Sequence, residues 1–418
     1  MAEASDLPSA CDVAVVGGGP AGLAAATELK RQGVARVLVL DREPAAGGIP
    51  RHCGHYPFGM REFRKVLRGP DYAGRLVTRA AQAGAEIHTG VTVTRIQPGG
   101  RLSLTSPEGT KELQAKRVLL CTGVRETSRA ARLIGGERPL GVLPTGALQS
   151  LVYLEQMKPF ERPVILGSEL VSFSALMTCR HAGIEPQAMI EPNQRITARN
   201  PARGLPFLLG VPLHLGCEIE GIIGEKRVEA VQLRNRDGRQ WELPCDGVLM
   251  TGRFTPEATL ARMGHLELDR GTGGPRVDQY GRSSDPDIFV AGNLLRPVET
   301  AGWSWKEGLQ VARCLARDLE APQEREGTLE LRAEGEAIRY LMPQQVTLPL
   351  QDTAFQDIQV RVDRPARGSL LIRSAGRILW GRRLSALPER RILVPLDVLA
   401  NAAPDCPVEV VFEEENGL

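Results

Sequence analysis

The sequence of 418 residues predicts an α/β protein with two similar halves, followed by a small β domain. An apolar run, a helical pattern and a second apolar run open the chain, and the same order returns at residues 162–192. Each half also contains a later apolar run that ends in Thr-Gly, at 122–123 and at 251–252. Beyond about residue 325 the pattern changes to short alternating runs that are typical of β-strands.

The first element is a βαβ unit. Residues 12–18 are a Val-rich apolar run, residues 20–32 have a helical pattern, and residues 37–40 form a second apolar run. Such an order predicts two parallel strands joined by a helix, which is half of a Rossmann-type fold.

A G-x-G-x-x-G motif lies where the first strand meets the helix. Gly17 allows a tight turn, Gly19 lets a pyrophosphate approach the backbone, and Gly22 brings the helix against the strand. The helix N-terminus then offers free N–H groups to the phosphates. Asp41, at the end of the second strand, is the acid expected to bind the ribose hydroxyls. A glycine-rich turn without a ligand is the alternative, and the agreement of motif, strand, helix and acid disfavours it.

The second half repeats this unit with a degenerate motif. Residues 167–172 stand in register with residues 17–22, but two of the three glycines are replaced. Glu169 would place a carboxylate where the backbone must approach an anionic pyrophosphate, and Ser172 would loosen the packing of helix on strand. An ordinary nicotinamide site is therefore disfavoured. A degenerate site that binds nothing, or that binds another nucleotide in another pose, is favoured, and a working nicotinamide site remains the alternative.

Composition excludes several partners. The 52 basic and 50 acidic residues give a net charge of +2 without a long like-charge run, so nothing predicts nucleic-acid binding. The eight cysteines are widely spread and contain no C-x-x-C, which fits a reducing, cytoplasmic location and predicts no metal site. Neither a signal peptide nor a membrane-spanning segment is expected.

Four stretches of sequence resemble one flavoprotein family. They are DVAVVGGGPAGLAAA at 12–26, VLVLDRE at 37–43, VLLCTG at 118–123 and DIFVAGN at 287–293. The chain resembles the pyridine-nucleotide-disulfide oxidoreductases, with two dinucleotide-binding domains, over about residues 10–320. This resemblance implies a discontinuous FAD-binding domain at 10–150 and 270–322 and an inserted NAD(P)-binding-like domain at 151–269. The small β-rich domain then covers 326–418.

The same resemblance, together with the motif, gives the candidate FAD-binding residues. They are Gly17, Gly19, Pro20, Ala21, Gly22, Asp41, Arg42, Gly47, Gly48, Val93, Thr122, Gly123, Gly292, Asn293 and Trp303. Asn293 stands where the family usually has Asp, although an amide can still bond a ribityl hydroxyl. Trp303 opens the helix that points at the flavin ring in this fold, and packing at a domain or subunit interface is the alternative. Arg125 and Glu126 are a salt-bridged turn or a ligand contact.

The redox cysteine pair of the disulfide reductases is missing. Cys53 lies soon after Gly47 and Gly48, between His52 and His55, with no second cysteine nearby. A structural role in the loop of residues 49–69 is favoured, a contact with flavin or substrate is the alternative, and a metal site is disfavoured. No acid–base dyad or nucleophile is visible, so no catalytic residue is predicted.

Longer stretches resemble a narrower group. They are GGIPRHCGHYPFG at 47–59, TGVRETSRAARLIGGERPLGVLPTGALQ at 122–149, ILGSELVSFSALMTCRHAGI at 165–184 and AGWSWKEG at 301–308. They resemble the α-type (A) subunits of hydrogen cyanide synthase, opine oxidases, and proline and hydroxyproline dehydrogenases. The resemblance implies an electron-transfer subunit whose sister flavoprotein, of the amino-acid-oxidase type, oxidises the small-molecule substrate. A small iron–sulfur subunit is a further expected partner, because the C-terminal domain has only Cys406.

Two other functions remain open at this point. The first is a stand-alone NAD(P)H-dependent FAD oxidoreductase, which requires the degenerate second site to bind nicotinamide. The second is a non-catalytic scaffold that holds a nucleotide only to stabilise an assembly. Under the favoured function, FAD is the cofactor and NAD(P) is not expected, while a second nucleotide or flavin at the degenerate site or a subunit interface is an alternative.

Overall fold

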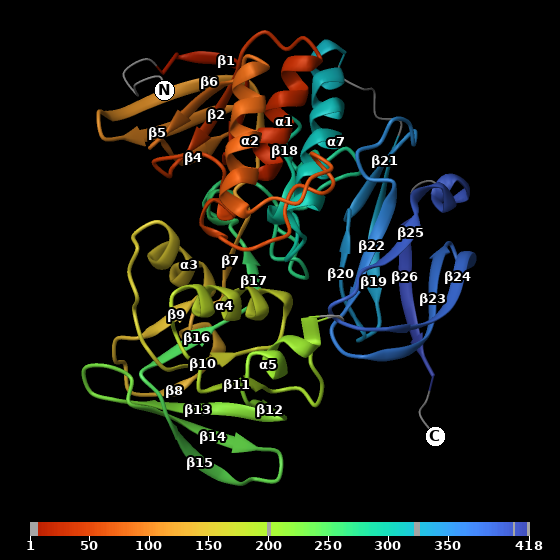
Figure 1. The fold of residues 1–418 in the computed structure, drawn as a ribbon. Coiled ribbons are helices and arrows are strands. Elements are labelled where there is room, and N and C mark those ends of the chain that lie inside the picture. The colour runs from red at the N-terminus through yellow and green to blue at the C-terminus, as the bar shows by residue number, and fades with distance from the viewer. Residues whose placement is uncertain (1–6, 199–201, 322–326, 404–405, 416–418) are drawn as a thin grey trace.

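The computed structural model describes residues 7–198, 202–321, 327–403 and 406–415. It has two α/β domains and a C-terminal β domain that lies beside both of them (Figure 1). The predicted boundary between residues 322 and 326 lies outside the described residues. In the part of the chain that is described, no helix is both long and apolar enough to cross a membrane.

The first domain is built on a seven-stranded sheet. Its strands follow the order β3 (Glu86–Thr89), β2 (Val37–Asp41), β1 (Ala10–Val16), β6 (Gly109–Leu120), β5 (Arg101–Ser106), β4 (Thr92–Gln97), with β18 (Ile288–Val290) also paired to β6. The strands β3, β2, β1, β6 and β18 pair parallel with one another, as a βαβ origin requires, whereas β4, β5 and β6 pair antiparallel. Three helices lie side by side against this sheet in Figure 1: α1 (Pro20–Arg31), α2 (Gly69–Gln82) and α7 (Ala301–Glu320).

The second domain has three layers. A parallel sheet has the order β12 (Leu213–Leu215), β11 (Ala188–Glu191), β10 (Pro163–Leu166), β16 (Gly247–Met250), β9 (Val142–Pro144). Its helices are α3 (Thr145–Tyr153), α4 (Leu170–His181) and the short α5 (Leu205–Leu208). The other face packs on a sheet with the order β15 (Gln240–Pro244), β14 (Ala230–Asn235), β13 (Cys217–Ile223), β8 (Gly135–Gly136). The central strands β10, β11 and β16 are therefore buried on both faces, which explains their mostly apolar sequences.

The two α/β domains are joined by a pair of crossing strands. These are β7 (Val124–Glu126) and β17 (Phe254–Pro256), which pair antiparallel. The chain consequently enters the second domain well before residue 150, because β9 pairs with β16 and α3 packs in the second core. It also returns before residue 270, since α6 (Thr259–Met263) packs against β4. The elements thus place the crossings near residues 125 and 255 rather than at the ranges expected from the sequence.

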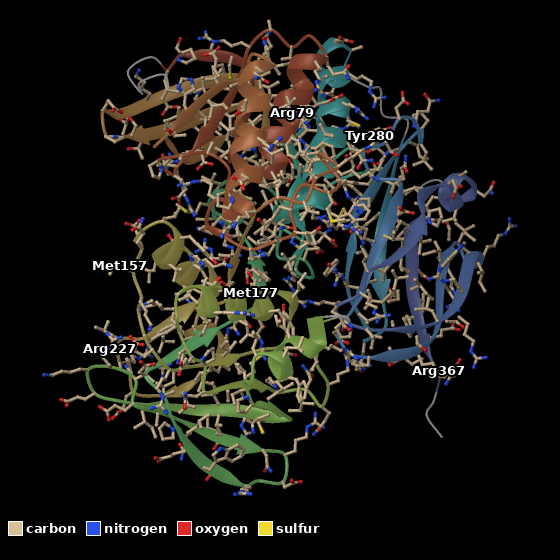
Figure 2. The ribbon with its side chains drawn as sticks, in the orientation of Figure 1. Arg79, Met157, Met177, Arg227, Tyr280 and Arg367 are labelled. Atoms are coloured by element: carbon tan, nitrogen blue, oxygen red, sulfur yellow. The ribbon has the colours of Figure 1, made fainter. Side chains whose placement is uncertain are left out.

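The C-terminal domain is a β-sandwich. One sheet has the order β21 (Gln345–Leu348), β19 (Gly327–Glu334), β26 (Val408–Glu414), β23 (Ala366–Ser374), β24 (Arg377–Ala386), and the other β20 (Ile338–Met342), β22 (Asp357–Val362), β25 (Ile392–Pro395). It is anchored on the first domain, whose core includes Met342 and Phe355. Tyr280, labelled in Figure 2, adds a hydrogen bond of 2.9 Å from its hydroxyl to the Pro349 carbonyl. The domain is therefore packed against the first α/β domain rather than tethered to it.

Candidate functional site: two equivalent turns

The first glycine turn holds strand and helix in very close contact. Gly17 has φ +105°, and a Cβ there would lie 2.5 Å from the Cys121 carbonyl oxygen. A Cβ on Gly22 would lie 2.0 Å from the Gly17 carbonyl oxygen. Helix α1 then starts at Pro20 after an extended Gly19, so its first N–H groups have no intrahelical acceptors. This geometry can bind a phosphate at the helix N-terminus.

Asp41 lies at the end of β2, directly beside this turn. Its carboxylate is buried and accepts two backbone hydrogen bonds, from Gly18 N at 2.8 Å and from Glu43 N at 2.9 Å. Burial raises the pKa of this carboxyl, and the two backbone bonds oppose the shift. A carboxylate offers about four lone-pair sites, so two remain for the hydroxyls of a ribose.

Further glycines, which have no side chain, surround the start of α1. Gly47 and Gly48 both have positive φ, and a Cβ on Gly48 would lie 2.8 Å from the Gly19 Cα. Gly292, with φ +75°, approaches from the other side, where a Cβ would lie 2.8 Å from the Ala21 Cβ. Three separate segments thus meet at the helix N-terminus with glycine backbone. The site brings these predicted residues together as a pyrophosphate requires.

The other candidate residues lie in more varied surroundings. Thr122 donates its hydroxyl to the Glu257 carbonyl at 2.7 Å, whereas Gly123, with φ +77°, faces open space. The Val93 side chain is buried in the first core, which leaves its main chain as the candidate ligand contact. Arg42 is exposed and lies 3.6 Å from the Glu43 carboxylate. Their roles in binding FAD stay predictions.

Asn293 and Trp303 both have partners within the chain. The Asn293 amide donates to the Glu299 carbonyl at 3.0 Å and accepts from Glu299 N at 2.7 Å, which closes the loop before α7. The Trp303 ring lies between two guanidinium groups, with Arg61 at 4.0 Å and Arg391 at 3.9 Å from its centroid. Packing at a domain junction, the alternative considered from the sequence, is thus what the structure shows for Trp303. A flavin contact by either residue stays a prediction.

Cys53 is a buried thiol between the two α/β domains. Its Sγ lies 3.4 Å from both the Ile49 carbonyl oxygen and Gln149 Oε1. Burial, with a smaller effect of the Glu126 charge, raises the pKa of Cys53 to about 12. Desolvation also lowers the pKa of His52. These features favour the structural role of the loop, and no group of side chains suited to a metal ion is found among the described residues.

Glu126 joins the two crossings between the α/β domains. Its carboxylate accepts from Gly146 N at 2.8 Å and from Gly252 N at 3.2 Å, which lie on the entering and returning segments. Burial raises the pKa of this carboxyl. Arg125, its neighbour, pairs instead with Glu257. The pair is therefore not one salt bridge, and the backbone partners of Glu126 were not visible in the sequence.

The second turn repeats the geometry of the first. Gly167 has φ +116° and donates its N–H to the Ile190 carbonyl at 2.8 Å, as Gly17 does to Leu40 at 2.9 Å. Glu191 ends β11 where Asp41 ends β2. The internal duplication predicted from the sequence is thus visible in the backbone.

The second acid, however, has most of its acceptor sites occupied by its own chain. Glu191 accepts from Ser168 Oγ at 2.5 Å, from Asn193 N at 2.8 Å and from Asn193 Nδ2 at 2.6 Å. Three bonds leave about one of the four lone-pair sites of Glu191 free, whereas Asp41 keeps two. The segment after β11 also covers the turn, since Thr197 N donates to Ser168 Oγ at 2.9 Å. The sequence analysis did not predict this role of Ser168, which lies within the degenerate motif, or of Asn193, which lies two residues after Glu191.

Glu169 fills the rest of the second site. Its carboxylate packs so close to Gly252 that a Cβ there would lie 2.4 Å from it, and it accepts from Arg253 N at 3.3 Å. Burial raises the pKa of this carboxyl, while Arg132 opposes the shift. Ser172 is fully buried, with its Oγ 2.5 Å from Thr251 Oγ1. Ser172 was expected to loosen the packing of helix on strand, and it also forms a hydrogen bond between the helix and the residue that follows β16.

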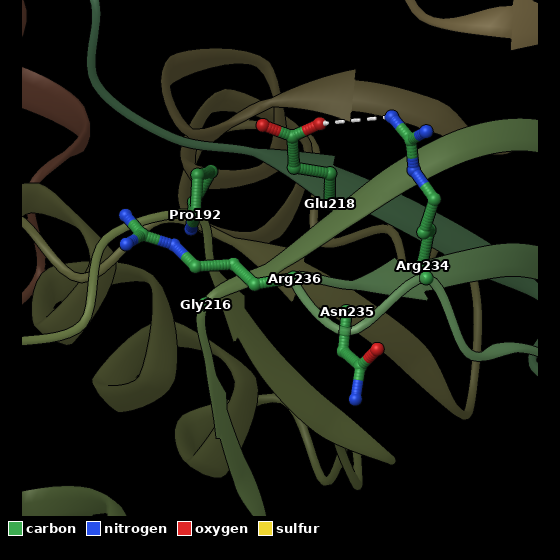
Figure 3. Close-up of a pocket in the computed structure, with 7 residues that line it drawn as sticks. Pro192, Gly216, Glu218, Arg234, Asn235 and Arg236 are labelled. Atoms are coloured by element: carbon green, nitrogen blue, oxygen red, sulfur yellow. Dashed lines mark ion pairs between the residues drawn. The ribbon is translucent and has the colours of Figure 1, made fainter.

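An open hollow of about 270 Å³ lies between the segment after β11 and the β14–β15 turn (Figure 3). Pro192 and Gly216 line it, and Arg236 extends over it from the β14–β15 turn. Arg234, on the far side, lies 3.8 Å from Glu218. The hollow is shallow and its walls are exposed, so it shows no built ligand site.

A known protein family matches most of this chain, including both turns. The model of the pyridine nucleotide-disulphide oxidoreductases matches residues 11–311. This chain belongs to that family. The family is one of FAD-dependent oxidoreductases, as the sequence predicted.

Individual relatives agree with this assignment. The A-type subunit of opine oxidase from Rhizobium meliloti is 32% identical over 68% of this chain and 66% of its own length. The alpha subunit of sarcosine oxidase from the same organism is 26% identical over 84% of this chain and 34% of its own. The chain thus spans less than two thirds of these relatives. Among solved structures, T. acidophilum thioredoxin reductase superposes with a TM-score of 0.64 at 23% identity, over 75% of this chain and all of its own, which confirms the fold.

Proposed function

We propose that this chain is the FAD-binding, electron-transfer subunit of a heteromeric flavin-dependent dehydrogenase or oxidase. Its sister subunit would oxidise an amino acid, an opine or a related 2-substituted acid. The observation that carries the proposal is the contrast between the two turns. The first presents bare backbone and a half-satisfied acid, whereas the second is filled by Ser168, Glu169 and Asn193.

The residues of the first turn suit FAD. The N-terminus of α1 offers N–H groups and a positive dipole end to a pyrophosphate, and Asp41 offers free lone pairs to a ribose. When bound, FAD supplies the two-electron chemistry that no side chain here provides. The chain's own groups then hold and orient the cofactor. We assign no catalytic acid, base or nucleophile among these groups.

The second turn is unsuited to NAD(P)H. A pyrophosphate there would meet the Glu169 carboxylate, and a ribose would find only about one free acceptor site on Glu191, so its second hydroxyl would have to displace a hydrogen bond. We therefore propose that electrons enter from a partner protein rather than from a nicotinamide. The names of the relatives, subunits of opine and sarcosine oxidases, support such a partner. A cytoplasmic location, which suits eight free cysteines, belongs to the same proposal, as does a small iron–sulfur partner.

An anaerobic reduction experiment tests this function. The purified chain is expected to be yellow, and its flavin band should stay unbleached by NADH, NADPH, amino acids or 2-hydroxy acids until a co-expressed partner is present. Rapid bleaching of the chain alone by NADH would favour the stand-alone reductase instead. The variant Glu169→Gly is the matched control: it removes the carboxylate from the second turn and leaves the first turn unchanged.

A further inference from the structure

Two edge strands of the C-terminal domain face each other across a groove. Strand β24 ends the larger sheet and β25 ends the smaller one. A cavity of about 330 Å³ lies between them, lined by both strands and by the segment that joins them. Each edge strand carries backbone N–H and C=O groups without a partner strand on that side. The groove is therefore a position where an extended chain can add to a sheet.

Three arginines give this groove a positive charge. Arg382 comes from β24, and Arg390 and Arg391 come from the joining segment. Within the described ranges no ion pair is formed by Arg382 or Arg390. The nearest acid in the sequence, Glu389, is held by Arg195 in two hydrogen bonds of 2.8 and 2.9 Å. The groove thus has an excess of positive charge, which comes mainly from Arg382 and Arg390, because Arg391 is paired with the Glu299 carboxylate.

Apolar side chains accompany the arginines. Leu384 and Leu393 line the groove, and Ile378, further along β24, is 60% exposed. Exposed apolar side chains on an unpaired edge favour association unless a partner covers them. An occupant that alternates acidic and apolar residues would match both features, because successive side chains of a strand point to opposite sides.

The groove lies where all three domains meet. Of three consecutive residues, Glu389 binds Arg195 of the second domain, Arg390 lines the groove, and Arg391 stacks on Trp303 at the start of α7. Arg391 also lies 3.4 Å from the Glu299 carboxylate. An occupant of the groove would therefore contact the segment that links the C-terminal domain to both α/β domains.

We infer that this groove binds an extended, acidic segment of a partner protein, added as a strand along β24. The segment belongs to the sister subunit, and this assignment of its source rests on the proposed function. Charge complementarity selects an acidic segment, and the free edge selects an extended one. The competing explanation is that the arginines only protect the edge strands from self-association.

Peptide binding to the full-length protein tests the inference. The probe is a fluorescein-labelled peptide of about eight residues in which Glu and Val alternate. Fluorescence anisotropy should show saturable binding, and Arg382→Glu with Arg390→Glu should weaken it by at least about 10-fold, because both charges change sign. The matched control is Arg332→Glu with Arg339→Glu, two exposed arginines of the same domain that lie on β19 and β20 and do not line the groove. The control should bind as the wild type does, and thermal melting shows whether both variants are folded.

Two further probes separate the outcomes. A peptide of alternating Glu and Pro keeps the charge but has fewer N–H groups for an edge strand, so it should bind much more weakly. A Lys–Val peptide should not bind. Absence of binding by the Glu–Val peptide, equal losses in both double variants, or equal binding of the proline peptide would overturn the inference. Each of these results leaves the anaerobic reduction experiment, and hence the proposed function, untouched.

Discussion

Replacing Gly22 by serine would give the first turn the residue that the second turn has at the same place. A Cβ on Gly22 would lie 2.0 Å from the Gly17 carbonyl oxygen and 3.1 Å from Val15 Cγ1. Ordinary van der Waals contact begins at 3.4 Å, so the start of α1 must move away by the difference, about 1.4 Å. Ser172 needs no such shift, because it is already buried against Thr251.

Such a shift should weaken both the fold and the binding of FAD. Overpacking costs about 1–3 kcal/mol of folding free energy. Misaligning one charge-assisted hydrogen bond from the α1 N-terminus to a phosphate costs about 1.5–3 kcal/mol of binding energy. That loss corresponds to roughly 10- to 150-fold in the dissociation constant. Gly22→Ser should therefore be purified with little flavin.

The assay is reconstitution of the apoprotein with FAD, followed by flavin fluorescence, with melting temperature as the check of folding. Ser172→Gly is the control. It removes the buried hydroxyl beside Thr251, should cost about 1 kcal/mol of stability, and should leave FAD affinity unchanged. If Gly22→Ser bound FAD as tightly as the wild type, the close approach of α1 to β1 would not be what positions the cofactor.

Three further predictions concern the surrounding structure. Because burial raises the pKa of Cys53 to about 12, iodoacetamide at pH 8 should modify it far more slowly than in the unfolded chain, with a thiolate fraction of about 10⁻⁴; fast labelling of the folded protein would contradict its burial. Glu307→Leu leaves the fully buried Arg296 without its carboxylate and should lower the free energy of unfolding in urea by about 3–5 kcal/mol. The double variant with Arg296→Met should recover much of this loss. If the double variant were as unstable as the single variant, the unpaired charge of Arg296 would not be the cause of the loss. Arg195→Ala breaks a partly exposed pair with Glu389 and should cost less than about 1 kcal/mol, measured by thermal melting.

Local requirements explain why the first turn could be predicted. The conformation of Gly17, the closeness of Gly22 and the place of Asp41 all follow from one strand–helix–strand unit, whose parts are close in sequence. The same local reasoning predicted the second unit and the misfit of Glu169. The family resemblance then supplied the order of the domains. These parts of the site needed no knowledge of long-range packing.

Long-range pairing explains what the sequence did not show. Strand β9 belongs to the second domain because Leu143 pairs with Leu249, more than a hundred residues away. The surroundings of Trp303 depend on Arg391, which comes from another domain. The filling of the second site depends on the direction of the chain after Glu191, which brings Thr197 onto Ser168. No periodicity or motif encodes such returns of the chain.

The second domain is also held in place by contacts with the rest of the chain. Glu126 binds both crossing segments, and Arg195 binds the C-terminal domain, so the second domain is held at its base and at its side. A domain that delivers a nicotinamide must let its ligand enter and leave, and neither the filled turn nor these contacts provide for that. Under the proposed function, the second domain instead provides a fixed surface on which a partner protein is positioned. The edge groove, whose Arg391 contacts Trp303 on α7 of the first domain, would then set the orientation of that partner relative to the flavin domain.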